Sequence, residues 1–138
     1  MKNKFPIFLC AAAIAALVLV AGCDSAPTRQ PKHTTTVKLV PDMSAPAVEI
    51  GLVSAVHIVL PGPDAGSGLV WEITSNNTAV LEQQGPLATE TGPGGVTTST
   101  SFYSLRPGKS ILKFDLVRPS DMDAIPAAKC EVTVRVVE

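Results

Sequence analysis

The side chains of this sequence that are best suited to covalent or metal chemistry are three cysteines and two histidines. They are Cys10, Cys23, His33, His57 and Cys130. A metal site built from cysteine and histidine needs several ligands at close spacing, and these five residues do not provide that spacing. A nucleophilic thiol needs a neighbouring base, and the sequence around the cysteines offers none. We therefore expect no metal, no cofactor and no enzymatic activity.

The N-terminal 22 residues have the three parts of a secretion signal. Two lysines open the chain, an apolar run follows over 5–20, and small residues at 21–22 precede Cys23. The sequence Val-Ala-Gly-Cys at 20–23 resembles the lipobox of bacterial lipoproteins. This resemblance implies that Cys23 carries a lipid and is the first residue of the mature chain. The alternatives are a transmembrane helix, since the run is near the threshold of about 18 residues, and ordinary cleavage elsewhere.

The lipobox resemblance implies a location in the cell envelope, with the domain on the periplasmic or extracellular side of a membrane. A lipid-bearing cysteine with two or more acyl chains gives stable anchoring. Asp24 resembles the inner-membrane retention signal of enterobacterial lipoproteins, a rule that varies between bacterial groups, so the choice of membrane stays open. Without the two signal lysines, 9 basic and 12 acidic side chains remain, a net charge of −3. We expect no nucleic-acid partner.

The rest of the chain divides into a polar tether at 23–34 and one domain at 35–138. In the domain Cys130 is left without a partner for an intramolecular disulfide and is expected to be a small buried residue. Alternating apolar residues between Pro and Gly turns predict about seven short strands. These strands are expected at 35–40, 53–60, 69–74, 79–83, 96–105, 110–118 and 129–137. The pattern predicts an all-β fold, an Ig-like antiparallel β-sandwich, with Trp71 as a core anchor on a central strand.

Three turns between the strongest strands carry a second resemblance. They are Asp-Ala-Gly-Ser-Gly at 64–68 followed by Trp71, Gly-Pro-Gly-Gly at 92–95, and Arg-Pro-Ser at 118–120. In order and spacing they resemble the three loops of chagasin-type inhibitors of papain-like cysteine peptidases, over roughly residues 48–137. The resemblance implies an Ig-like domain that occludes the cleft of such a peptidase without being cut.

The same resemblance implies which residues would contact the peptidase. These are Asp64, Gly66, Ser67, Gly68, Gly94, Gly95, Arg118, Pro119 and Ser120, with Trp71 supporting the first loop from the core. Two loop tips differ from the family pattern, because Asp-Ala-Gly at 64–66 replaces Asn-Pro-Thr and Ser120 replaces Trp. A buried aromatic anchor at an interface is often worth about 2–4 kcal/mol. This difference leaves a second hypothesis open, a non-inhibitory Ig-like module that binds another envelope protein or serves structurally.

Overall fold

Eight β-strands form the domain in the computed structural model, which describes residues 29–121 and 123–138. The expected signal at 1–22, the expected lipidation site Cys23 and the first half of the expected tether, up to residue 28, lie outside the described residues. The part of the chain that is described contains no helix long and apolar enough to cross a membrane. The strands are β1 (His33–Lys38), β2 (Val48–Gly51), β3 (Ser54–Pro61), β4 (Val70–Ser75), β5 (Leu81–Gly92), β6 (Gly95–Ser104), β7 (Gly108–Val117) and β8 (Ala128–Val137).

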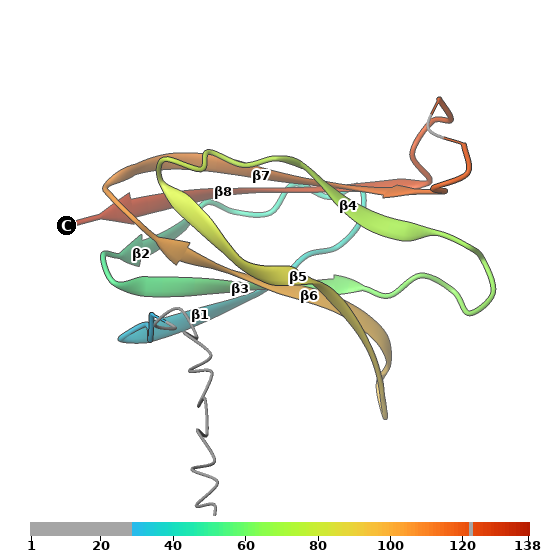
Figure 1. The fold of residues 1–138 in the computed structure, drawn as a ribbon, viewed down its shortest axis with the longest axis horizontal. Coiled ribbons are helices and arrows are strands. Elements are labelled where there is room, and N and C mark those ends of the chain that lie inside the picture. Colours follow the sequence, from blue (N-terminus) through green and yellow to red (C-terminus); the bar gives the residue numbers. More distant parts are fainter. Residues whose placement is uncertain (1–28, 122) are drawn as a thin grey trace, which may run out of the picture.

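The strands form two four-stranded sheets that pack face to face (Figure 1). The first sheet has the order β1-β3-β6-β5 and the second the order β2-β8-β7-β4. The expected β-sandwich is therefore confirmed, but it is not purely antiparallel, because β1 pairs with β3 and β2 with β8 in parallel. This mixed pairing arises because β1 and β2 are each followed by a crossing to the other sheet and not by a hairpin within the same sheet.

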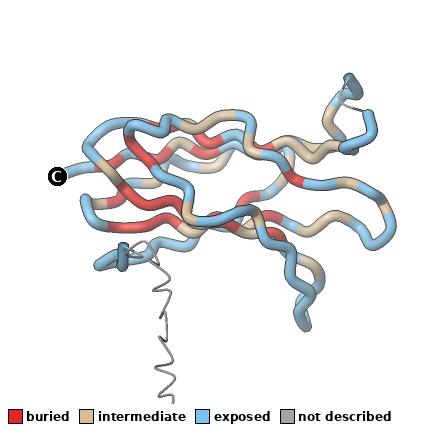
Figure 2. The backbone as a smooth tube through the Cα atoms, in the orientation of Figure 1, coloured by how far each residue is buried: buried red, intermediate tan, exposed pale blue. Residues whose placement is uncertain are grey.

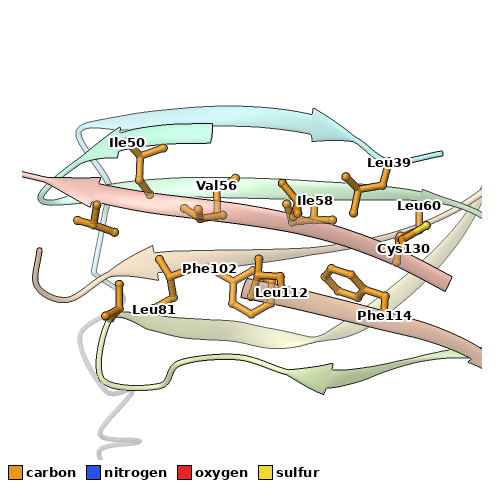
Figure 3. Packing of buried hydrophobic residues seen from close by; sticks show 14 of the residues in the cluster. Leu39, Ile50, Val56, Ile58, Leu60, Leu81, Phe102, Leu112, Phe114 and Cys130 are labelled. Carbon is orange, nitrogen blue, oxygen red and sulfur yellow. The ribbon is translucent and has the colours of Figure 1, made fainter. Parts of the chain in front are cut away.

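The core lies between the sheets and follows the alternation of side chains along the central strands (Figures 2 and 3). Every second residue of β3 and β8 faces inward, so Ile58 and Val134 are fully buried. Phe102 of β6 and Phe114 of β7 meet edge to face, with ring centroids 6.5 Å apart. This contact joins the two sheets in the core between them.

Four local expectations from the sequence were wrong. β2 was not expected as a separate strand, and β5 is 12 residues long instead of the short segment at 79–83. β5 is an edge strand with a register shift between Gln84 and Ala88, which accommodates Gly85 and Pro86. β4 is also an edge strand, so Trp71 does not lie on a central one. In addition β1 starts at His33, within the segment 23–34 that was expected to be tether.

Candidate functional site

The three loops singled out in the sequence lie at one end of the sandwich (Figure 1). The first loop (62–69) joins β3 to β4, the second loop (92–95) is the turn of the β5–β6 hairpin, and the third loop (118–127) joins β7 to β8. The strand registers require this arrangement, because Pro61 pairs with Thr97 and Val70 with Val117. Residues separated by more than fifty positions are thereby brought together at one end of the sandwich.

Two hydrogen bonds hold the base of the first loop. One joins it to β4 of the second sheet, and the other joins it to β6 of the first sheet. The indole Nε1 of Trp71 donates to the carbonyl oxygen of Pro61 over 2.7 Å, and the Trp71 side chain is buried. The backbone N–H of Gly62 donates to the carbonyl oxygen of Val96 over 2.7 Å. A Cβ atom at position 62 would lie 2.3 Å from Val96, so only glycine allows this approach of loop and strand. Trp71 thus lies at the base of the first loop, bonded to the residue that precedes it.

The tip of the first loop is a tight turn. The N–H of Ser67 donates to the carbonyl oxygen of Asp64 over 3.1 Å, and Gly66 at the third position of the turn has φ +77°. Gly68 also has a positive φ, at +69°. The hydroxyl oxygen of Ser67 accepts a bond from the N–H of Leu69 over 3.3 Å. The two glycines therefore serve the backbone path of the loop, which leaves Asp64 and Ala65 exposed at its tip.

The third loop begins with a second turn and lies against the first loop. Pro119 occupies the second position of this turn, which the N–H of Asp121 closes by donating to the carbonyl oxygen of Arg118 over 3.0 Å. The loop ends where the N–H of Ala127 donates to the carbonyl oxygen of Leu116 over 2.8 Å. The guanidinium Nη2 of Arg118 reaches the carbonyl oxygen of Ser67 at 3.5 Å. Arg118 thus connects the first and third loops, while Ser120 is exposed.

The second loop is connected to the others through its strand and not through its tip. Gly92 pairs with Gly95, which has φ +108°, and Pro93 and Gly94 form the tip of the hairpin. Figure 1 shows that the hairpin curves away from the first and third loops. The link to the first loop is the bond between Gly62 and Val96 described above. The structure therefore brings two of the three predicted loops into contact and places the third at the same end but apart.

Two hollows flank the side chain of Arg118. One has a volume of about 210 Å³ and lies between Leu69 of the first loop and Asp121, Ala124 and Ile125 of the third loop. The other, of about 240 Å³, is lined by Glu72, Val117, Arg118 and Pro119. Both are open depressions at the loop end. These hollows could not be predicted from the sequence, because residues distant along the chain line them together.

The residue types suited to metal or thiol chemistry do not gather into a metal-binding cluster in the described part of the chain. No cluster of three or more His, Cys, Asp or Glu side chains among residues 29–121 and 123–138 could hold a metal ion. Cys130 is buried as expected, and burial, with a smaller contribution from the carboxylate of Asp42, raises the pKa of its thiol to about 11. His57 contacts Ser101, with 2.8 Å between Nδ1 and Oγ.

Comparison with known proteins identifies solved structures that share this β-sandwich fold. No family model matches the sequence, and no curated protein matches it. The solved structure of the cysteine protease inhibitor EhICP2 from Entamoeba histolytica is similar, with a TM-score of 0.64 and 14% identity, over 76% of this chain and 96% of that one.

Two further solved structures are similar to this chain. Amebosin has a TM-score of 0.53 and 16% identity, over 78% of this chain and 99% of its own. PbICP-C, solved in complex with falcipain-2, has a TM-score of 0.50 and 14% identity, over 80% of this chain and 93% of its own. The fold expected from the resemblance to chagasin-type inhibitors is thus confirmed.

Proposed function

We propose that this chain is a membrane-anchored lipoprotein whose domain inhibits a papain-like cysteine peptidase by inserting the three-loop end into its cleft. The observation that carries the proposal is that the three loops lie at one end of a fold shared with EhICP2 and with PbICP-C, the latter solved in complex with falcipain-2. Residues expected in the contact are the exposed tips of these loops, with Trp71 supporting the first loop from behind.

The internal bonds of the loops favour this function over a passive role. A partner that binds mobile loops must order them, and that ordering weakens the complex. Here Trp71 and Gly62 hold the first loop to both sheets, and Arg118 connects it to the third loop. Much of the binding surface is therefore organised before a partner arrives. Occlusion of a cleft requires no reactive side chain, which fits the buried and proton-bearing thiol of Cys130.

The position of β1 supports an anchored inhibitor. His33 pairs in parallel with Ser54, the first residue of β3, so β1 begins at the end opposite the three loops. The six residue steps from Cys23 to Arg29 span at most about 20 Å, since an extended chain advances about 3.3–3.6 Å per residue. A lipid on Cys23 would hold the far end of the domain near the membrane and direct the loops away from it.

A non-inhibitory envelope module is the second candidate, and one feature favours it. The tips of the first and third loops carry small residues, Ala65, Gly66 and Ser120, instead of a large aromatic side chain. Interface energy is concentrated in a few large anchors, so small tips favour weaker or different binding. An inhibitor of this kind would need an anchor elsewhere at the same end.

Titration of papain with the soluble domain, residues 24–138, tests the proposal. Hydrolysis of a small fluorogenic peptide should fall as the domain is added, and Arg118→Ala should weaken the inhibition about tenfold. Arg106→Ala is the matched control, because Arg106 is also exposed and also precedes a proline, but it lies in the β6–β7 turn at the opposite end. Absence of inhibition at micromolar concentration against papain and falcipain-2 would contradict a general inhibitor and favour the second candidate.

The anchoring is tested separately in a bacterial host. The full chain should incorporate a radiolabelled fatty acid and sediment with membranes, and Cys23→Ser should abolish both. Labelling that persists in the Cys23→Ser variant would contradict the proposed lipidation site.

A further inference from the structure

One apolar side chain in the third loop is exposed to an unusual degree. Ile125 exposes 90% of its surface, more than any other large hydrophobic residue in the described ranges, of which the next is Met43 at 64%. Isolated apolar residues on a surface are common, but the side chain of a nearly fully exposed isoleucine contributes almost nothing to the stability of the fold. The stability of the domain therefore does not explain an isoleucine at this position, and we look for an explanation in binding.

The backbone around Ile125 is fixed on both sides. The N–H of Ala124 donates to the carbonyl oxygen of Asp121 over 3.3 Å, and the N–H of Ala127 donates to that of Leu116 over 2.8 Å. Isoleucine is branched at Cβ and has few rotamers to lose when it is buried. Ile125 is thus presented to solvent on a held loop, with a small entropic cost for its burial by a partner.

The surface beside Ile125 is continuous with the first loop. The hollow of about 210 Å³ is lined by Leu69 of the first loop together with Leu116, Ala124 and Ile125. Arg118 and Asp121 also line it and bring a charge of each sign. An apolar centre with polar side chains around it is the usual composition of a protein interface. This surface lies at the same end as the three loops and joins two of them.

We infer that Ile125 is the apolar anchor of the third loop, inserting into an apolar subsite of the peptidase cleft and favouring peptidases that possess one. The inference rests on the proposed function and adds to it the residue that binds and the chemistry of the subsite it needs. It also accounts for the small residue at position 120, because the large side chain is supplied five positions later, on the far side of the same loop.

The test compares inhibition constants of the full soluble domain and its variants against one papain-like peptidase that the domain inhibits. Ile125→Ala removes three carbon atoms from the contact and should weaken inhibition roughly 10- to 100-fold. Ile125→Leu should stay within about threefold of the unmodified domain, and Ile125→Asp should lose most inhibition. Thermal unfolding should be unchanged in all three variants, since the side chain makes little contact in the free domain.

Val137→Ala is the matched control, because Val137 is an exposed aliphatic residue at the opposite end of β8, and it should leave inhibition unchanged. If the unmodified domain inhibits and Ile125→Asp inhibits equally well, the inference is wrong while the proposed function stands. If the unmodified domain inhibits no papain-like peptidase, both are wrong. A concentration-dependent dimer in sedimentation experiments that Ile125→Asp abolishes would show that a second copy covers this residue, and would overturn the inference.

Discussion

Trp71 donates its indole N–H to the carbonyl oxygen of Pro61 over 2.7 Å, and this bond joins the edge strand of one sheet to a central strand of the other at the base of the first loop. Pro61 is the last residue of β3 and Trp71 the second of β4, so the bond closes the segment between them. The first loop is therefore fixed from below by a residue that belongs to the core. This relation between core and loop leads to the first prediction.

Trp71→Phe should keep most of the core packing and remove the hydrogen bond. We expect a loss of about 1 kcal/mol in the free energy of unfolding and a fall of roughly 4–8 °C in Tm. Inhibition should weaken several-fold, because the first loop is less well held. Phe102→Leu, a core change away from the loops, is the control and should lower Tm without changing the inhibition constant of the folded domain. Equal inhibition by Trp71→Phe and the unmodified domain would count against a supporting role.

Gly62→Ala should separate the first loop from β6. The new Cβ would lie 2.3 Å from Cγ1 and 2.6 Å from the backbone carbonyl carbon of Val96, so the backbone must move. Overpacking of this kind typically costs about 1–3 kcal/mol. Gly94→Ala is the comparison for stability, because a Cβ there meets no atom within 4 Å and its φ is not positive. Chemical denaturation should show a large loss for the first variant and almost none for the second.

Val53→Asn should stabilise the domain. Val53 has φ +59°, a left-handed conformation that costs a β-branched residue roughly 1–2 kcal/mol, and Asn tolerates it better. Its side chain is 39% exposed, so little packing is lost. The expected gain is about 1 kcal/mol in the free energy of unfolding, with inhibition unchanged at the opposite end. Val70→Asn, at a strand position with ordinary φ and similar exposure, should give no gain. A drop in Tm for Val53→Asn would contradict the strain.

Cys130 should make stability sensitive to alkaline pH. In the folded domain the pKa of its thiol is raised from an ordinary 9.0 to about 11, so the folded state keeps a proton that the unfolded state releases. The contribution to stability is complete below pH 9 and is lost as the pH rises toward about 11. Between pH 9 and about 11, the free energy of unfolding measured by denaturation should therefore decrease more for the unmodified domain than for Cys130→Ala. In the domain 24–138, a thiol reagent at pH 8 should react after unfolding and not before.

Much of the fold could be predicted because alternation and Pro-Gly turns mark central strands well. Val132, Val134 and Val136 face inward as their spacing indicates. The edge strands were harder, since an edge strand needs little apolar patterning. β5 carries Gly85 and Pro86, and its pairing with β6 comes from cross-strand contacts such as that of Thr89 with Thr98. Long-range pairing of this kind leaves no local signal in the sequence.

In the candidate site, too, features with a local sequence signal could be predicted and long-range contacts could not. Turn residues marked the loop positions, and the resemblance to chagasin-type inhibitors implied that Trp71 supports the first loop. The approach of Arg118 to Ser67 spans 51 positions and could not be read from either segment alone. Ile125 was missed because an isolated aliphatic residue in a loop has no pattern, and its near-complete exposure becomes evident only when the surrounding turns are known.

The central claim, that the loop end of this domain fills the cleft of a papain-like peptidase, is tested most directly by protection of the catalytic thiol. Active papain is mixed with increasing amounts of the domain 24–138, and the rate at which a small alkylating agent modifies its catalytic cysteine is measured. The rate should fall in proportion to the fraction of papain bound, the domain should remain uncut, and Arg118→Ala should protect less than Arg106→Ala. An unchanged alkylation rate under conditions where peptide hydrolysis is inhibited would contradict occlusion of the cleft.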